Sequence, residues 1–285
     1  MQTTPRKSTS VCRSIQTLSV CLTVGSLITT LVVSGCQSVP VSERKRLYIA
    51  VPTSYENQMG LQAYQEILDE EPLTKNQQYS AMVKRVGSRI AAVANQPDFD
   101  WEFNVIESET QNAFCLPGGK VAIYTGILPV CENEAGLAVV MSHEIAHAIA
   151  RHGGERMQQN VIRVGGQKVT EYVTREASEE KKQLILAAYG GATEYGFILP
   201  YSRKHELEAD EIGLLLMAEA GYDPSEAPLF WDRFAAQKQG EAPMEFMSTH
   251  PSDVHRASAL RELLPRATAQ YEQSATKYGV GEPIR

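Results

Sequence analysis

The sequence predicts an α+β fold that is mostly helical and contains one small antiparallel sheet. Residues 58–95 carry apolar side chains at helical spacing, and several segments after residue 134 do the same. Between them, segments 101–108 and 120–128 are rich in β-branched and aromatic residues with partial alternation, which is typical of strands. Helices, a short run of strands and then mostly helices indicate an α+β domain.

The first helical block is expected to form two helices with a break near Glu71-Pro72. The break is predicted because the residue before a proline is disfavoured in the helical conformation. The second helix has one apolar stripe, which would face the core. That stripe contains Tyr79, Met82, Val83, Val86, Ile90 and Val93.

The two expected strands are separated by Pro117-Gly118-Gly119, which is a turn or bulge signal. After the strands, Gly153-Gly154 and Gly221 would each end a helix. Asp223-Pro224-Ser225-Glu226 would start another, because Asp is a good N-cap and Pro suits the first helical position. The expected helices cover 134–152, pieces of 155–200, 203–220, a segment after 223, and a last stretch from after Ser252 to about Leu264.

The first 35 residues differ in composition from the rest. Arg6, Lys7 and Arg13 make a basic start without acidic residues, and an uncharged run extends from Ser14 to Cys36. This layout is typical of a secretory signal peptide. A single transmembrane anchor is the alternative, because the run is about long enough to span a bilayer, although Ser, Thr and Gly dilute it.

The end of that run favours the signal peptide. Val33-Ser34-Gly35-Cys36 resembles the lipobox of bacterial lipoproteins, which implies cleavage before Cys36 and attachment of lipid there. In the same resemblance, Gln37 favours the outer membrane. We therefore expect a lipid-anchored protein on the periplasmic face of a bacterial cell envelope. The expected divisions are a signal peptide (1–35), a polar tether (36–57), a folded domain (58–268) and a C-terminal tail (269–285).

Charge and cysteine content bear on partners and on covalent links. The formal net charge is −7 and no long block of one sign appears, so nothing indicates a nucleic-acid partner. Cys115 and Cys131 would remain after cleavage, in an oxidising compartment that permits a disulfide. Their pairing stays open, because sequence does not show whether the two Cβ atoms meet.

Residues 143–147 read HEIAH inside a segment that is otherwise almost wholly apolar. On a helix, His143 and His147 lie one turn apart on the same face and can bind one metal ion. Glu144 lies about 100° further round, where it can act as a general base toward water. Burying a lone carboxylate is costly unless a cation compensates for it. The alternative is a core helix in which all three side chains have ordinary partners.

His152 follows the same motif but is out of phase with it. It lies nine residues after His143, about half a turn away on a continuous helix, and would therefore face away from the metal. The extended metzincin pattern, with a third histidine ten residues after the first, is absent. We expect His152 to interact with the helix C-terminus or a local partner.

A third ligand must then come from another segment. Residues 202–213, SRKHELEADEIG, place Glu206 and Asp210 on one helical face. We expect Glu206 to be the ligand and Asp210 to hold the other nitrogen of a ligand histidine. Glu208 would point to a different side, and His205 lacks a helical partner. Two histidines, a glutamate and an open position are usual for catalytic zinc, so one Zn²⁺ per chain is expected.

Four blocks together resemble the HtpX-like and CAAX prenyl protease-like zinc endopeptidases of metallopeptidase family 48, which are gluzincins. They span about residues 60 to 265 in the family's order, and the chain looks most similar to a compact periplasmic lipoprotein branch. The blocks are NAFCLPGGKVAIYTGIL (112–128), HEIAH (143–147), YSRKHELEADEIGLLLMAEAGYDP (201–224) and STHPSDVHR (248–256).

The resemblance implies the same metal ligands, with Glu144 as the base and Asp210 behind a ligand. For His250 it leaves two roles open, stabilising the oxyanion or occupying the open metal position in a resting state. A plain loop residue is the alternative. Arg256 would hold that loop or an acidic partner.

The resemblance also implies how a substrate would bind. An extended peptide would pair with an edge strand through main-chain hydrogen bonds. That edge strand would comprise Gly118, Gly119, Lys120, Val121, Ala122 and Ile123.

The implied activity is zinc-dependent hydrolysis of peptide bonds in unfolded or misassembled cell-envelope proteins. A catalytically silent lipoprotein, acting as a chaperone or assembly scaffold, is the main alternative. A metal carrier or structural-zinc protein is another. The presence of Glu144 argues against a scaffold, because a protein that only binds needs no general base. An open three-ligand site argues against a structural metal.

Overall fold

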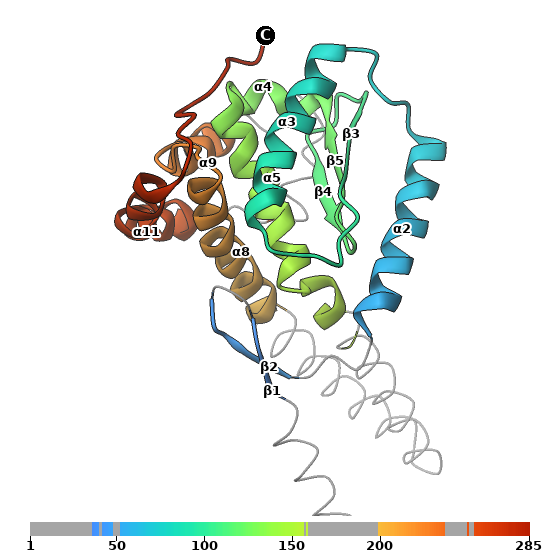
Figure 1. Ribbon diagram of the computed structural model, residues 1–285, viewed down its shortest axis with the longest axis horizontal. Helices are drawn as coiled ribbons and strands as arrows, with labels where there is room; N and C mark the ends of the chain where they lie inside the picture. The colour runs from blue at the N-terminus through green and yellow to red at the C-terminus, as the bar shows by residue number, and fades with distance from the viewer. Residues whose placement is uncertain are drawn as a thin grey trace, which may run out of the picture. The chain divides into compact units, whose positions relative to one another are not determined.

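Figure 1 shows the computed structural model, which describes residues 36–39, 42–47, 52–156, 158, 199–236, 250 and 254–285. The expected signal peptide and most of segment 155–200 lie outside the described residues. The chain divides into two compact units, residues 1–48 and 49–285. In the first unit, β1 (Cys36–Ser38) and β2 (Lys45–Leu47) pair as antiparallel strands.

The second unit is α+β and mostly helical, as predicted. α2 begins inside the expected tether and α11 continues past residue 268. None of the described helices combines the length and apolarity needed to cross a membrane. The elements are α2 (Thr53–Glu70), α3 (Gln77–Val93), β3 (Glu102–Ile106), β4 (Ala113–Leu116), β5 (Lys120–Tyr124), η1 (Thr125–Ile127), α4 (Leu128–Cys131), α5 (Glu134–Ile149), α8 (Leu199–Glu219), α9 (Glu226–Ala236) and α11 (Val254–Gln273).

β5 lies in the middle of a three-stranded sheet with the order β3-β5-β4. It pairs parallel with β3 and antiparallel with β4, so the sheet is small, as predicted, but mixed. The predicted edge strand is therefore wrong, because its residues precede or form the central strand. Those residues are Gly118, Gly119, Lys120, Val121, Ala122 and Ile123. The two glycines, at φ 86° and 83°, turn the chain back so that β4 becomes an edge.

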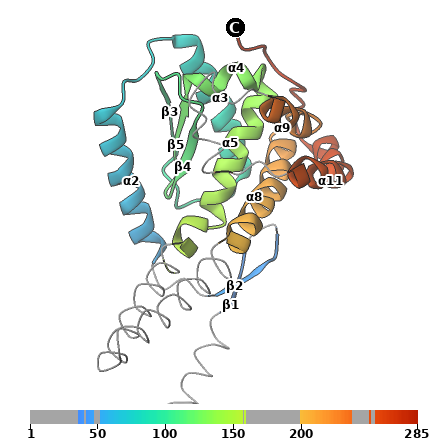
Figure 2. The same ribbon diagram turned by 180° about the vertical axis from the view of Figure 1, so that it is seen from behind.

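Helices cover both faces of this sheet (Figures 1 and 2). On one face α2 contributes Tyr64, which packs with Ile106 and Tyr124 and donates its hydroxyl hydrogen to Val121 O at 2.8 Å. On the other face α3 and α5 pack so closely that side chains of β3 and α5 surround Gly87 of α3. All five residues of β5 are buried as a result.

α5 carries HEIAH and is buried along its whole length. The first-turn amides of a helix have no partner within the helix and need acceptors from outside it. Three acceptors serve α5: Asn133 Oδ1 for Gly136 N at 2.9 Å, Glu282 O for Glu134 N at 3.0 Å, and Val280 O for Ala135 N at 3.0 Å. The C-terminal segment thus completes the start of the helix that holds the metal motif.

α8 packs directly beside α5 and brings the second half of the motif to the first (Figure 2). The two backbones lie close together at Gly213. A side-chain carbon at that position would lie 3.0 Å from His143 N and 3.1 Å from its Cα. A larger residue at this position would require the backbone at His143 to give way by a few tenths of an ångström, so glycine suits this close approach of α8 to the metal motif.

Candidate zinc centre

Four buried side chains from three segments converge at the C-terminal half of α5. His143 and His147 belong to α5, Glu206 to α8, and His250 precedes α11; their ligand atoms all lie within 4.8 Å of one another. His143 Nε2 and His147 Nε2 are 3.1 Å apart. His250 Nδ1 lies 3.1 Å from Glu206 Oε2 and 3.3 Å from His143 Nε2. The three expected ligands are thus brought together, and His250 joins them.

These separations fit a single Zn²⁺ ion. Ligand atoms about 2.0–2.1 Å from a tetrahedral zinc lie roughly 3.3–3.4 Å from one another. Glu206 lies 3.4 Å from His143 Nε2 and 3.5 Å from His147 Nε2. The two imidazole nitrogens and the carboxylate are also the donor types that catalytic zinc prefers.

The electrostatics of the cluster favour a cation. Burial raises the pKa of the Glu206 carboxyl, but His143 and His250 outweigh it and hold that pKa far below its usual range. Burial lowers the pKa of His143, but its bonds with Asp210 and Glu206 raise it to about 9. Burial and the neighbouring His143 hold the pKa of His147 well below its usual value, so that ring is neutral and able to bind metal.

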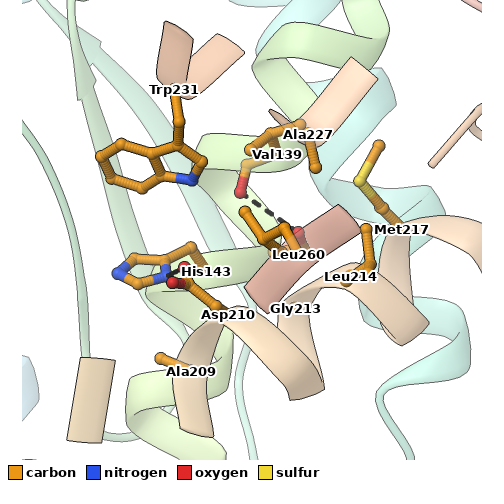
Figure 3. Close-up of a pocket in the computed structure, with 11 residues that line it drawn as sticks. Val139, His143, Ala209, Asp210, Gly213, Leu214, Met217, Ala227, Trp231 and Leu260 are labelled. Atoms are coloured by element: carbon orange, nitrogen blue, oxygen red, sulfur yellow. Dashed lines mark hydrogen bonds and ion pairs between the residues drawn. The ribbon is translucent and has the colours of Figure 1, made fainter. Parts of the chain in front are cut away.

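Asp210 lies behind His143, as Figure 3 shows. Its Oδ1 is 3.0 Å from His143 Nδ1, which leaves Nε2 of that ring for the metal. Arg256 donates two hydrogen bonds to the same carboxylate and lies 3.2 Å from Glu206 Oε2. Trp231 stands beside the His143 ring, and its ring centroid lies 3.8 Å from the Arg256 guanidinium carbon. His143 is therefore held from two directions.

His152 does not face away from the site, which contradicts the expectation. α5 ends at Ile149 and Arg151 takes a left-handed backbone conformation, at φ 56°, so the helical phase does not continue. The His152 ring turns back and its Nδ1 lies 2.9 Å from Nδ1 of His147. It is not one of the four clustered groups, so the expectation that it is no ligand agrees with the geometry. Its local partner is Glu208, at 2.9 Å from Nε2.

A cleft of about 260 Å³ opens beside the cluster and is lined by Glu144, His147, His250 and the residues of β4. Glu144 is buried, and burial raises the pKa of its carboxyl. Its Oε1 has no hydrogen-bond partner among the described residues, and His250 Nε2 lies 3.4 Å away. A buried carboxylate oxygen with no donor, next to a metal cluster, is placed to accept a proton from a water molecule.

Cys115 and Cys131 are both free thiols, so the disulfide that the sequence left open is not formed. Cys115 in β4 lies near Glu144. Cys131, at the end of α4, lies near Arg233 and Glu226. The two thiols are therefore held in different surroundings.

The predicted site residues did not include Trp231 or Gly213. Trp231 has no pattern that links it to the motif, and no signal could have found it. Gly213 did carry a signal, because glycine inside a helix costs about 1 kcal/mol relative to alanine and is kept where another backbone comes close.

The sequence profile of Peptidase family M48 matches residues 77–264. The chain belongs to peptidase family M48. It is 39% identical over 240 residues to mitochondrial metalloendopeptidase OMA1 of Schizosaccharomyces pombe, a match that covers 83% of this chain and 68% of that protein.

Two further relatives of this M48 chain extend the comparison. OMA1 of Saccharomyces cerevisiae is 35% identical over 255 residues, covering 82% of this chain and 71% of the yeast protein. The β-barrel assembly-enhancing protease of Escherichia coli O157:H7 is 26% identical over 227 residues, covering 78% of this chain and 46% of its own.

Family membership and these relatives show that the M48 chain is a zinc metalloendopeptidase, which favours the enzyme over the scaffold. The expectation of family 48 is confirmed. The relatives named above are OMA1 and the β-barrel assembly-enhancing protease, and they do not confirm the narrower HtpX-like or CAAX prenyl protease-like resemblance.

The expected location is wrong. The relatives with 39% and 35% identity are mitochondrial proteins by name, which contradicts a periplasmic or outer-membrane location in a bacterial envelope. The expectation came from residues 1–37 alone, whereas the match with these mitochondrial proteins covers over four-fifths of the chain.

Proposed function

We propose that this M48 protein is a membrane-attached endopeptidase that hydrolyses extended segments of unfolded or misassembled proteins. The observation that carries the proposal is the edge strand β4, which lines the same cleft as Glu144 and two members of the metal cluster. Any extended chain can pair with a strand edge, because the hydrogen bonds involve only its main chain. Segments inside folded proteins already have such partners.

The register of β4 supports Cys115 as the residue whose backbone would pair with a substrate. Tyr124 N donates to Asn112 O, and Phe114 lies opposite Ala122. In an antiparallel pair, alternate residues bond to the neighbouring strand. The backbones of Asn112 and Phe114 therefore bond toward β5, whereas the amide and carbonyl of Cys115 point away from β5, toward the side of β4 that pairs with no other described strand. A substrate strand that pairs there would pass alongside Glu144.

The chemistry follows from the positions of the polar groups. Held by the cluster, Zn²⁺ would supply a Lewis acid that polarises the scissile carbonyl. Glu144 would take a proton from the attacking water on Oε1 and deliver it to the departing amine nitrogen. Asp210 would keep the His143 ring in the tautomer whose Nε2 faces the metal position.

His250 fits the resting-state role better than the oxyanion role. Its Nδ1 is already among the ligand atoms, 3.1–3.3 Å from Glu206 and His143. Its Nε2 approaches the Oε1 atom of Glu144 that would receive the proton. We place His250 in the fourth position of the resting enzyme, which it would leave when substrate enters.

Attachment to a membrane is proposed from the N-terminal sequence. The basic start and apolar run of residues 1–35 would be removed, and Cys36 would carry lipid. The residues between Cys36 and the start of α2 at Thr53 would then connect the lipid to the peptidase domain. The mass of the mature N-terminus tests this. A lipid-modified Cys36 at the N-terminus supports it, and an intact N-terminal segment overturns it.

The names of the relatives support the proteolytic part of the proposal. Several are metalloendopeptidases, and one is named for enhancing β-barrel assembly, which agrees with a quality-control role. The experiment compares the wild type with Glu144→Gln, each at measured zinc content, on a permanently unfolded carboxymethylated protein and on its folded disulfide-bonded form. We expect the wild type to cleave the unfolded form at least tenfold faster, and Glu144→Gln to lose about 10²–10⁴-fold activity while retaining zinc.

Two results would count against the proposal. Zinc-loaded wild type that cleaves neither substrate would remove the proteolytic function. Equal cleavage of the folded and unfolded forms would remove the preference for extended segments while leaving an endopeptidase.

A further inference from the structure

The two ligand histidines of α5 are held from behind in different ways. His143 Nδ1 meets a carboxylate directly, at 3.0 Å from Asp210 Oδ1. His147 Nδ1 instead meets a second imidazole, that of His152, at 2.9 Å. The second imidazole reaches a carboxylate in turn, because His152 Nε2 lies 2.9 Å from Glu208 Oε2. A chain of two hydrogen bonds therefore runs from Glu208 through His152 to His147.

The direction of these hydrogen bonds follows from what each group can do. An ionised carboxylate only accepts, so Glu208 requires the proton of His152 to sit on Nε2. A neutral imidazole has one N–H, so Nδ1 of His152 then has a lone pair and accepts. His147 must therefore donate from its own Nδ1. Its Nε2 is left with the lone pair, and this is the atom that lies 3.1 Å from His143 Nε2 in the cluster.

The His152 ring is fixed in place independently of His147. It is fully buried, at 0% exposure. His205 stacks on it with ring centroids 4.1 Å apart and planes at 16°, and His205 Nε2 lies 3.2 Å from Glu155 Oε2. A ring that is packed on one face and bonded to the Glu208 carboxylate through Nε2 has little freedom to turn, even without its contact to His147. It can impose an orientation on His147 rather than follow it.

We propose that His152 is a positioning residue for the zinc ion, which acts through His147 and takes its own orientation from Glu208. It does not touch the metal position. It selects the tautomer of His147 that presents Nε2 and limits rotation of that ring. The proposal rests on the zinc site alone, and not on the proposed substrate or membrane attachment.

Two isosteric variants test the proposal. Asn places its amide where the Nδ1 of histidine lies, and Gln places its amide near Nε2. His152→Asn therefore keeps a partner for His147, whereas His152→Gln keeps a partner for Glu208 only. We expect the zinc dissociation constant, measured by competition with a chromophoric chelator, to rise about 10–100-fold for His152→Gln and clearly less for His152→Asn. The visible absorption of the Co²⁺-substituted proteins should change in the same order.

A purely structural role would give the opposite ranking, because Gln fills more of the buried space than Asn. Zinc binding by His152→Gln that is as tight as, or tighter than, that by His152→Asn overturns the proposal. Tyr64→Phe is the matched control, because it removes a buried side-chain hydrogen bond to Val121 O away from the metal. It should lower the thermal stability of the zinc-free protein and leave zinc affinity unchanged.

A variant of Glu208 tests the other end of the hydrogen-bond chain. Glu208→Leu keeps the approximate volume but removes the acceptor for His152 Nε2, so both tautomers of His152 become available. We expect its zinc affinity to fall at least severalfold. If this variant binds zinc as tightly as the wild type, then Glu208 does not orient His147 through His152, and the proposal is overturned. This test remains available even if the His152 variants do not fold.

Discussion

Arg256 donates two hydrogen bonds to the carboxylate of Asp210, from Nε and from Nη2, each at 2.7 Å. Both side chains are almost fully buried. Burial raises the pKa of Asp210, but Arg256 and His143 more than offset it, and the pKa lies below its usual value. A charge on α11 therefore keeps ionised the carboxylate on α8 that orients a zinc ligand on α5.

Arg256→Leu should destabilise the protein severely. Removing one partner of a buried ion pair leaves the other charge without compensation, which costs about 3–5 kcal/mol. Chemical denaturation of the zinc-free protein measures the loss. Arg261→Leu is the control on the same helix, because Arg261 and Asp232 form an exposed pair worth about 0–1 kcal/mol. Equal losses for both variants would contradict the role given to burial.

Gly213→Ala should weaken the contact between α8 and α5. The added carbon would meet backbone atoms of His143, which cannot move aside as a side-chain end could. Overpacking of this kind costs about 1–3 kcal/mol, and the shift of α8 should also lower zinc affinity. Gly153→Ala is the control, because a carbon there would meet no atom of the described residues within 4 Å. An unfolding free energy for Gly213→Ala at or above that of the wild type would show that the helices can separate freely.

Cys115→Pro should reduce cleavage of extended peptides. Proline removes the amide that faces the open edge of β4 and leaves the bonds of the neighbouring residues to β5 in place. The comparison is Cys115→Ala, which changes the side chain and keeps the amide. We expect KM for an unstructured peptide to be at least about tenfold higher for the proline variant. Similar KM values would mean that the substrate does not pair with β4.

His250→Ala should raise the cleavage rate of a short unstructured peptide. The side chain lies among the ligand atoms, so its removal opens the position that water and the substrate carbonyl need. Initial rates at equal zinc content measure the effect. A fall of tenfold or more would favour the oxyanion role instead, since loss of one such donor costs about 10²–10³-fold.

The ligands could be predicted because helical spacing decides which side chains share a face. Both pairs, His143 with His147 and Glu206 with Asp210, are four residues apart. On a helix this spacing places each pair on one face, independently of the tertiary structure. The order of strands has no such local rule. β4 is only four residues long, and the sequence showed the turn at Gly118-Gly119 but not which strand would be paired on both sides.

For His152, helical spacing predicted the wrong direction of the side chain. The expectation that it faces away assumed a continuous helix, and the phase is lost at Arg151. A left-handed conformation is uncommon for a residue other than glycine, so it could not be predicted at Arg151 from the sequence. The residue is held there partly by a contact of Arg151 Nε with Glu56, at 2.8 Å, which belongs to α2 and is distant in sequence.

The start of α5 has a consequence for how the enzyme is made. Its first amides bond to the carbonyls of Val280 and Glu282, which the ribosome adds long after the helix itself. Until they emerge, the helix that carries HEIAH has unpaired donors in a position that is later buried. The metal cluster also includes Glu206 and His250, which follow this helix in the sequence, so synthesis must pass His250 before all four groups of the cluster can meet.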